Sequence, residues 1–385
     1  MFTFFDTHRE RLALGGLSLA LLMSSLDTSI ANANLPMLAA AFGATFQQAQ
    51  WIVLAYLLAV TSLTVGAGRL GDLFGRRHLL LAGVALFTLT SVVCAAAPSL
   101  WVLIVGRAIQ GVFAATMMAL AIAVVGDVTS KARAGMAMGQ LAAMSAVGTT
   151  LGPAIGGVLH HLHPTAIFLV NVPLGVLAFV LLQRYLPAAP SRAGQPIPFD
   201  TAGTLLLALT LVSYTLSMTL GRGHWNALNV SLLVAAVLGA IAFAFAEVHA
   251  AAPLMPLAMF RDRGFSVSLA ANAAVSTVMM STLIVGPFYL SRALALDAAR
   301  VGVLLSLGPA AAAITAALAG RVVGRVGVTR TTIGGLTAMA IGALVLALLP
   351  RSSGVAGYVA PLMTMTSGYA VFQTANNTAV MTGVG

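Results

Sequence analysis

The chain has 385 residues, of which 59% are hydrophobic and 7% are charged, whereas about 25% are charged in an ordinary soluble domain. Because so few charges cannot cover a water-facing surface, the composition predicts a protein that faces lipid. The net charge of +10 is spread over single arginines and short clusters between apolar runs. This pattern excludes a basic nucleic-acid-binding face.

The N-terminal region combines Arg9 and Arg11 with an apolar stretch over about 12–35. This stretch is longer than the apolar part of a secretory signal peptide and matches the thickness of a bilayer core. We therefore expect it to be retained as a first membrane span. The one cysteine, Cys94, lies in an apolar run, so we expect a packing residue and neither a disulfide framework nor a metal cluster.

Apolar stretches recur along the whole chain and predict an all-α polytopic membrane protein with about 12 transmembrane helices. With a cytoplasmic N-terminus, fourteen Arg and Lys residues fall in inner segments and four in outer loops. This asymmetry is the one that the positive-inside rule requires, so we expect insertion in the inner (plasma) membrane with the N-terminus in the cytoplasm. The stretches are 13–35, 47–69, 79–97, 100–122, 136–159, 165–186, 201–220, 227–247, 265–290, 300–319, 331–349 and 355–380.

An internal repeat organises these stretches into two halves. The segment 68–75 (GRLGDLFG) is echoed at 320–327 (GRVVGRVG), each time where a span leaves for a cytoplasmic loop. Repeats of this kind build two-halved transporters, and the echo places the start of the second half at the ninth stretch. The segment 187–200 contains four prolines and is the clearest boundary in the chain. We therefore expect an N-terminal six-helix bundle over 1–186, a linker with two inserted helices over 187–264, and a C-terminal bundle over 265–385 with four of six expected helices.

Several long motifs occur along the chain. They are Leu26-Asp27-Thr28-Ser29-Ile30-Ala31-Asn32-Ala33-Asn34-Leu35-Pro36, Trp51-x-x-x-x-Tyr56-Leu57-Leu58, Gly68-x-Leu70-Gly71-Asp72-x-x-Gly75-Arg76-Arg77-x-x-Leu80, Arg107-Ala108-Ile109-Gln110-Gly111, Gly148-x-x-x-Gly152-Pro153-x-x-Gly156-Gly157, Phe168-Leu169-Val170-Asn171-Val172-Pro173 and Asn376-Asn377-Thr378-Ala379-Val380-Met381. Together these motifs resemble the major facilitator superfamily, and the likeness extends to its fourteen-span drug:proton antiporter branch. Where that branch has aromatic-Arg-aromatic, this chain has Pro164-Thr165-Ala166, and it stops at Gly385 where the branch continues through two further spans.

The resemblance implies a major facilitator fold with two pseudo-symmetric helix bundles and an inserted pair of helices. It implies a secondary active transporter, a proton-coupled antiporter that exports hydrophobic or cationic small molecules in the manner of multidrug efflux. An exporter of one specific metabolite and a truncated, non-transporting fragment are the open alternatives. A membrane-embedded enzyme is not expected, because the spans contain no nucleophile–base or metal constellation.

The implied partners are a small-molecule substrate, protons and the lipid bilayer, with no nucleic acid. We expect no cofactor and no metal, since the proton gradient is the energy source that the resemblance implies. A periplasmic adaptor protein is a further possible partner, and no motif in the sequence indicates whether one binds.

Asp27 and Arg107 are the candidate proton-coupling residues. A carboxylate inside a span costs about 2.5–3.5 kcal/mol on insertion scales and normally faces a cavity or a partner. Arg107 is the one basic residue that lies away from the ends of a predicted span, and its distance along that span puts it at the same predicted depth as Asp27. An arginine favours the ionised carboxylate and desolvation favours the protonated one, so the pair predicts a proton switch. A structural ion pair is the alternative.

The loop residues Gly68, Asp72, Gly75, Arg76 and Arg77 are expected to form a gate. Glycines permit a tight turn and a close helix approach, and Asp72 is expected to accept amides at a helix N-terminus. Plain positive-inside anchoring is the alternative for the two arginines.

An antiporter motif is expected at Gly148, Gly152, Pro153, Gly156 and Gly157. The spacing of its first, second and fourth members places small residues on one helix face, where they allow two helices to approach closely, and the proline predicts a kink. A role in preventing proton leak comes from the resemblance alone, and generic packing is the alternative.

A substrate cavity is expected to be lined by polar, aromatic and sulfur-containing side chains. Such side chains make an apolar, adaptable lining, although ordinary core or lipid contact is the alternative for each. The candidates are Met23, Asn34, Trp51, Tyr56 and Gln110.

Overall fold

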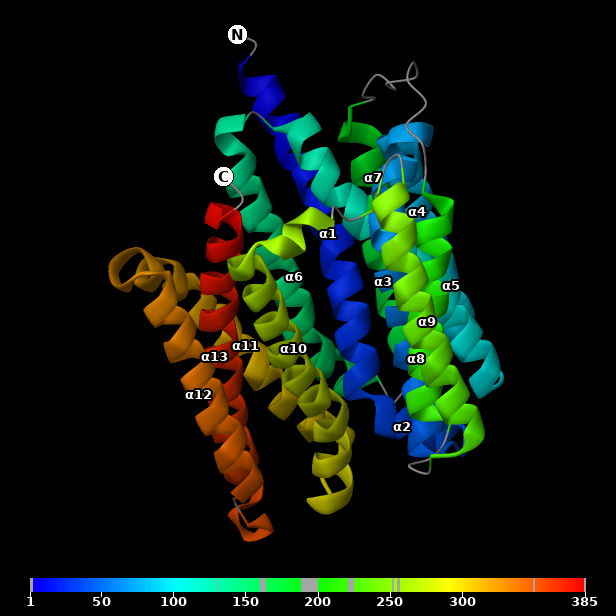
Figure 1. Cartoon of the computed structure of the whole chain (residues 1–385), viewed down its shortest axis with the longest axis vertical. Coiled ribbons are helices and arrows are strands. Elements are labelled where there is room, and N and C mark those ends of the chain that lie inside the picture. The colour runs from blue at the N-terminus through cyan, green and yellow to red at the C-terminus, as the bar shows by residue number, and fades with distance from the viewer. Residues whose placement is uncertain are drawn as a thin grey trace. The chain divides into compact units, whose positions relative to one another are not determined.

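The computed structural model describes residues 3–129, 131–159, 164–187, 200–220, 225–250, 253–254, 257–348 and 350–383. This part of the chain is helical and contains no strand. Most of the proline-rich segment lies outside the described residues, so its role as a boundary stays a prediction. The helices are α1 (Thr3–Ala33), α2 (Leu35–Ala41), α3 (Phe46–Phe74), α4 (Arg76–Ala95), α5 (Leu100–Val128), α6 (Lys131–Leu159), α7 (Asn171–Tyr185), α8 (Thr201–Thr219), α9 (Ala227–His249), α10 (Arg263–Phe288), α11 (Ala298–Val326), α12 (Val328–Leu348) and α13 (Gly354–Gly383) (Figure 1).

Polar residues in the loops fix where several helices begin. The Thr45 hydroxyl accepts the amide of Gln48, and the Gln48 side chain accepts the amide of Thr45, which makes a capping box for α3. Five other helices begin after a residue whose side chain accepts an amide of the first turn. These caps are Ser99 for α5, Asp200 for α8, Asn226 for α9, Asp262 for α10 and Asp297 for α11.

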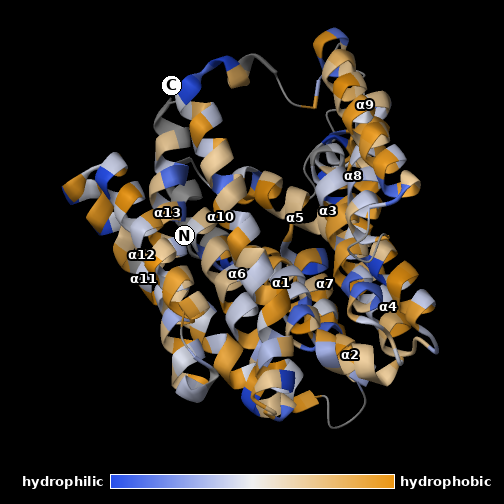
Figure 2. Cartoon of the chain, turned by 60° about the horizontal axis from the view of Figure 1, so that its bottom comes forward, coloured by the Kyte–Doolittle hydropathy of each residue, from blue (hydrophilic) through white to orange (hydrophobic). Residues whose placement is uncertain are grey.

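Within the described residues, 11 helices are long and apolar enough to cross a membrane. The predicted span 355–380 is helical as part of α13, but Gln373, Asn376 and Asn377 lower its apolar character, and it is not among the 11. Large apolar side chains are exposed along α9, where Val237, Ile241 and Phe245 are four residues apart on one face. Figure 2 shows this helix as largely hydrophobic, as expected for a surface that faces lipid.

The chain divides into two compact units. Unit 1 comprises Met1–Ser24, Ala39–Ser145 and Phe168–Leu257, and unit 2 comprises Ser25–Leu38, Ala146–Ile167 and Ala258–Gly385. The helices α1 and α6 therefore contribute to both. The predicted division at 186 and 264 stays a prediction.

In unit 1, α5 packs against α3 and α4, α7 packs against α4, and the pair α8–α9 packs against α3 through α8. Leu17, Phe87 and Leu120 are fully buried in its hydrophobic core. The helices α3 and α5 meet at Gly111, where an added Cβ would lie 2.5 Å from the carbonyl oxygen of Tyr56. Only glycine permits the backbones to approach this closely.

In unit 2, α13 packs against α10, α11 and α12, and α12 and α13 lie side by side in Figure 1 (orange and red). Their backbones meet at Gly335 and Gly368, where a Cβ on Gly368 would lie 2.6 Å from the Met339 amide nitrogen. Small residues at a crossing replace the hydrophobic effect as the source of tight packing between helices in lipid.

The internal repeat is visible in the backbone. Gly75 joins α3 to α4 with a φ of 90°, and Gly327 joins α11 to α12 with a φ of 88°. Both values lie in the left-handed region that favours glycine. In each unit the helix after the pair packs against both members, α5 against α3 and α4, and α13 against α11 and α12. The two echoed sequences therefore make the same turn between corresponding helices.

Candidate functional site

Arg107 lies on α5 in unit 1 with its side chain fully buried, at 0% exposure. Its Nε donates to the carbonyl oxygen of Ile52 at 3.2 Å, and its Nη1 donates to Oε1 of Gln110 at 2.6 Å. The guanidinium also lies over the ring of Tyr56, with 4.2 Å to the centroid, and near the ring of Phe168, at 5.3 Å. A permanent positive charge is thus held among hydrogen bonds and aromatic faces.

Further polar side chains surround the arginine. Nε2 of Gln110 donates to Oγ of Ser91 at 2.7 Å, and Nδ2 of Asn171 donates to the same oxygen at 3.2 Å. The Cys94 thiol donates to Oε1 of Gln110 at 3.7 Å. We call these residues, with Arg107 and Tyr56, the Arg107 cluster. The cluster joins α3, α4, α5 and α7, because its side chains come from four helices that are separated along the sequence.

Sequence reasoning identified Arg107, Gln110 and Tyr56, but it missed Ser91 and treated Cys94 as a packing residue only. The thiol is indeed buried, and a Cβ on Gly106 would lie 3.0 Å from its Sγ. One available signal was the spacing of Ser91 and Cys94, which are three residues apart and therefore share a face of α4.

Asp27 lies on α1 within the part that belongs to unit 2, and it is also 0% exposed. Hydroxyl side chains flank it in sequence, and Ser29 Oγ donates to the carbonyl oxygen of Thr149 on α6 at 2.7 Å. Asp27 and Arg107 belong to different units, and their predicted pairing stays a prediction.

The predicted gate lies between α3 and α4. Oδ1 of Asp72 is 2.8 Å from Nη2 of Arg76, and Nη1 of Arg76 is 3.1 Å from Oδ2 of Asp127 at the end of α5. Nη2 of Arg77 donates to the carbonyl oxygen of Gln183 on α7 at 2.6 Å. Asp127 was not found from the sequence. The segment is helical up to Phe74 and again from Arg76, so Asp72 in the last turn of α3 contacts the first residue of α4. Its expected contact with helix amides stays a prediction.

Gly68 and Gly75 are the remaining members of the predicted gate. A Cβ on Gly68 would meet nothing within 4 Å, so this position does not require glycine for packing. At Gly75 the positive φ is the constraint. The helix that follows begins directly at Arg76, so a rigid turn positions the arginine between two carboxylates.

The antiporter motif lies on α6 within unit 2, with Pro153 inside the helix. A Cβ on Gly152 would lie 2.6 Å from Cβ of Ser29, and one on Gly156 would collide with the side chain of Asn34. Gly148, the first member, is buried. Small residues here let the end of α1 lie directly on α6.

A second helix approaches the same motif. A Cβ on Gly157 would lie 2.6 Å from the carbonyl oxygen of Ala298 on α11, and the carbonyl of Pro153 faces Gly302 on the same helix. The motif is therefore a crossing point of three helix segments within unit 2. Its predicted role in preventing proton leak stays a prediction.

The predicted cavity residues are distributed over both units. Met23, Tyr56 and Gln110 are buried in unit 1, and Trp51 is half-buried there, whereas Asn34 is buried in unit 2. The Tyr56 hydroxyl is hydrogen-bonded to Oγ of Ser24 at 3.0 Å, and Nδ2 of Asn34 donates to the carbonyl oxygen of Ile30 at 2.8 Å. The lining of a shared cavity by these five stays a prediction.

Buried charged and amide side chains within apolar helices are typical of a substrate or ion pathway through a membrane. The model of the Major Facilitator Superfamily matches residues 17–385. The chain therefore belongs to the Major Facilitator Superfamily, and it is an integral membrane transporter.

Individual relatives agree with this class. The chain is 29% identical over 346 residues to the multidrug transporter protein MdtP of Bacillus subtilis (strain 168), which covers 89% of this chain and 63% of MdtP. It is 30% identical over 363 residues to the riboflavin transporter RibZ of Clostridioides difficile (strain 630), which covers 94% of this chain and 78% of RibZ.

A solved structure supports the fold alone. A bacterial homologue of the human lysosomal transporter Spinster matches with a TM-score of 0.67 at 14% sequence identity, covering 96% of this chain and 75% of that one. The expected major facilitator fold is thus confirmed.

Proposed function

We propose that this chain is a proton-coupled antiporter that exports hydrophobic or cationic small molecules, with Asp27 as the proton-binding group and Arg107 as the charge that tunes it. The observation that supports this proposal is the complete burial of both ionisable side chains within apolar helices. Burial of an ionised group costs several kcal/mol, so such residues in a transporter belong to its ion pathway more often than to its framework.

The coupling follows from the charge of Asp27. An ionised carboxylate in an apolar surrounding attracts either a proton or a cationic substrate, and the binding of one removes the charge that attracts the other. Exchange of a proton for a substrate then needs no separate energy source beyond the proton gradient. We propose that Arg107, whose charge is permanent, acts on the same exchange.

The membrane arrangement belongs to the same proposal. We place the N-terminus in the cytoplasm and the chain in the plasma membrane, because the basic residues gather in the segments that are then cytoplasmic. We also propose that α8 and α9 are the inserted pair of the fourteen-span branch, since they pair with each other and contact the rest of unit 1 through α3.

A specific-metabolite exporter is the second candidate, and the similarity to RibZ, which is named a riboflavin transporter, favours it. The similarity to MdtP, which is named a multidrug transporter, favours the first. Ethidium and riboflavin therefore form a discriminating pair of substrates. Export of both, or of ethidium alone, supports multidrug efflux, whereas export of riboflavin alone supports the alternative.

Asp27→Asn tests the coupling because it keeps the size of the side chain and removes its charge and its proton. In everted vesicles with an imposed pH gradient, we expect the variant to lose gradient-driven ethidium transport by at least about tenfold while it stays folded. Asp297→Asn is the matched control, since Asp297 is an exposed helix cap and asparagine caps equally well. Unchanged gradient-driven transport in Asp27→Asn would overturn the proposal.

A further inference from the structure

Within unit 1, the ring of Tyr56 on α3 covers the guanidinium group of Arg107 on α5. The centroid of the ring is 4.2 Å from the guanidinium carbon, and Tyr56 is 1% exposed. The edge of the same cation donates to the carbonyl oxygen of Ile52, which precedes Tyr56 by one turn of α3. One turn of α3 therefore holds the arginine by a carbonyl oxygen at its edge and by a ring at its face.

The backbone end of Tyr56 is fixed by the crossing of α3 and α5. A Cβ on Gly111 would lie 2.5 Å from the Tyr56 carbonyl oxygen and 3.1 Å from its Cα, so the two backbones are in contact at this residue. Gly111 follows Arg107 by about one turn of α5. The Cα of Tyr56 therefore keeps its place beside Arg107 unless the two helices separate.

The hydroxyl end of Tyr56 is held by α1. Oη of Tyr56 and Oγ of Ser24 are hydrogen-bonded at 3.0 Å, and Ser24 is 3% exposed. A hydrogen bond in such a buried place is stronger than one in water. A tyrosine side chain has two rotatable bonds, so a contact at each end fixes the ring in the orientation that covers the guanidinium group.

The internal repeat allows the same crossing to be compared in unit 2. The helix α11 follows α3 by the interval that separates the two echoed sequences. At this interval Gly308 is the counterpart of Tyr56, and Val359 is the counterpart of Arg107. A Cβ on Gly308 would lie 3.2 Å from Cγ of Leu362 on α13, so the crossing of α11 and α13 is formed without a ring or a charge at these two positions.

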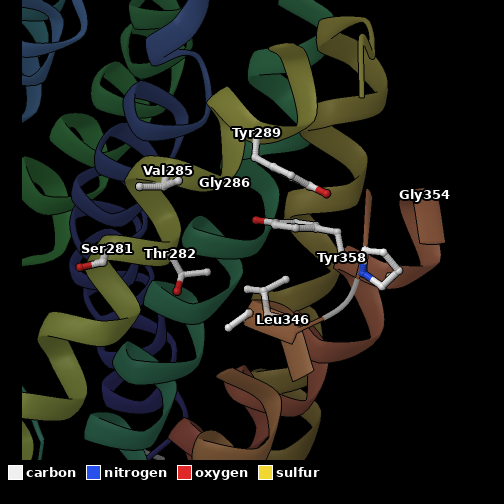
Figure 3. A pocket seen from close by; sticks show the side chains of 11 residues that line it. Ser281, Thr282, Val285, Gly286, Tyr289, Leu346, Gly354 and Tyr358 are labelled. Carbon is white, nitrogen blue, oxygen red and sulfur yellow. The ribbon is translucent and has the colours of Figure 1, made fainter. Parts of the chain in front are cut away.

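The aromatic contact beside Val359 is of a different kind. Tyr358 stacks on Tyr289, with ring centroids 5.7 Å apart (Figure 3). This ring contacts another ring, whereas the ring of Tyr56 contacts a cation. Since the repeated helices pack without a tyrosine over an arginine, helix packing alone does not account for the pair in unit 1.

We propose that Ser24 and Tyr56 are positioning residues for Arg107. The Ser24 hydroxyl holds the ring, and the ring holds the guanidinium group in the orientation in which its charge acts on the exchange of proton for substrate. This inference rests on the proposed function, in which Asp27 binds the proton. Asp27 follows Ser24 by less than one turn of α1, so a movement of α1 that accompanies protonation is transmitted to Arg107 through this hydrogen bond.

Two single substitutions break the hydrogen bond from opposite sides. Tyr56→Phe keeps the ring and removes its hydroxyl, and Ser24→Ala removes the other oxygen. Two assays in everted vesicles are compared, with whichever of ethidium and riboflavin the unmodified protein exports. Transport driven by an imposed pH gradient reports coupling to protons, and exchange of labelled for unlabelled substrate without a pH gradient reports substrate movement alone.

We expect each variant to lower gradient-driven transport roughly three- to tenfold, the range for one hydrogen bond, and to change the exchange rate less than about twofold. A purely structural role would lower both rates together, because fewer molecules would be folded. Retained exchange also shows that the variants are folded and inserted. Equal losses in the two assays would overturn the inference, and so would normal gradient-driven transport in Tyr56→Phe.

The double variant, Ser24→Ala with Tyr56→Phe, tests whether the two groups act as one contact. Each single change already breaks the same bond, so gradient-driven transport in the double variant should equal that of the more impaired single variant. Losses that multiply would show two independent effects and would overturn the inference.

Tyr214→Phe and Ser231→Ala are the matched controls, because they make the same chemical changes at exposed positions of α8 and α9. Both should leave both assays unchanged. Asp27→Asn separates this inference from the proposed function. Loss of gradient-driven transport in Asp27→Asn with normal transport in Tyr56→Phe overturns the positioning role alone, whereas normal transport in Asp27→Asn overturns the proposed function as well.

Discussion

At the scale of single residues, several polar and aromatic groups surround one buried cation, the guanidinium of Arg107. Arg107 uses two guanidinium nitrogens for hydrogen bonds and its flat face for Tyr56. Removal of one partner of a buried charge is more costly than removal of a surface contact, because the remaining group loses both water and its partner. Substitutions within the Arg107 cluster should therefore affect stability and transport together.

Arg107→Lys keeps the charge but replaces the planar fork by a single ammonium group. A lysine cannot reach the Ile52 carbonyl and Gln110 at once while it lies flat on the Tyr56 ring. We expect transport at equal expression to fall at least about tenfold and the free energy of unfolding to fall by about 1–3 kcal/mol. Arg184→Lys at the exposed end of α7 is the control. Normal transport by Arg107→Lys would show that the fork geometry is dispensable.

Ser91→Ala removes the oxygen that accepts hydrogen bonds from Gln110 and Asn171. We expect the free energy of unfolding to fall by about 2–4 kcal/mol, since two buried amide groups lose this acceptor. Thr90→Ala changes the adjacent residue of the same helix, whose hydroxyl donates to the carbonyls of Leu86 and Phe87, and should stay within about 0.5 kcal/mol. Thermal unfolding in detergent compares the stabilities of the two variants. Similar losses of stability would contradict the role of Ser91 as a shared acceptor in the Arg107 cluster.

At the scale of helices, small residues decide where segments meet. Gly156→Ala places a methyl group against Ile30 of α1 and against Asn34, which follows the end of that helix, so α1 must move away from α6. We expect a loss of about 1–3 kcal/mol in stability, as for other overpacked sites, and a clear loss of transport. Gly139→Ala on the same helix meets nothing within 4 Å, and its better helix propensity should leave it neutral or slightly more stable. Equal behaviour of the two variants would show that this crossing tolerates bulk.

At the scale of the whole molecule, the sequence predicted the fold better than it predicted the contacts. Span number and fold class follow from composition and apolar length, which depend on local sequence alone. Ser91 was missed because a hydroxyl in an apolar helix usually bonds a carbonyl of its own helix, as Thr88 and Thr90 do. Only the packing of α4 against α5 and α7 distinguishes Ser91 from them. Asp127 was also missed, because its partner Arg76 lies on another helix and is brought close only by packing.

Membrane orientation is the prediction that concerns every span at once. With a cytoplasmic N-terminus, the turn between α4 and α5 faces outward and the end of α9 faces the cytoplasm. Pro98→Cys and His249→Cys introduce thiols at exposed positions of these two segments, while the native Cys94 is 0% exposed and should stay unlabelled. A membrane-impermeant maleimide added to intact cells should label the first variant and not the second, and permeabilised cells should allow both. Labelling of His249→Cys alone in intact cells would show the opposite orientation in the membrane. A proton gradient would then drive transport in the opposite direction.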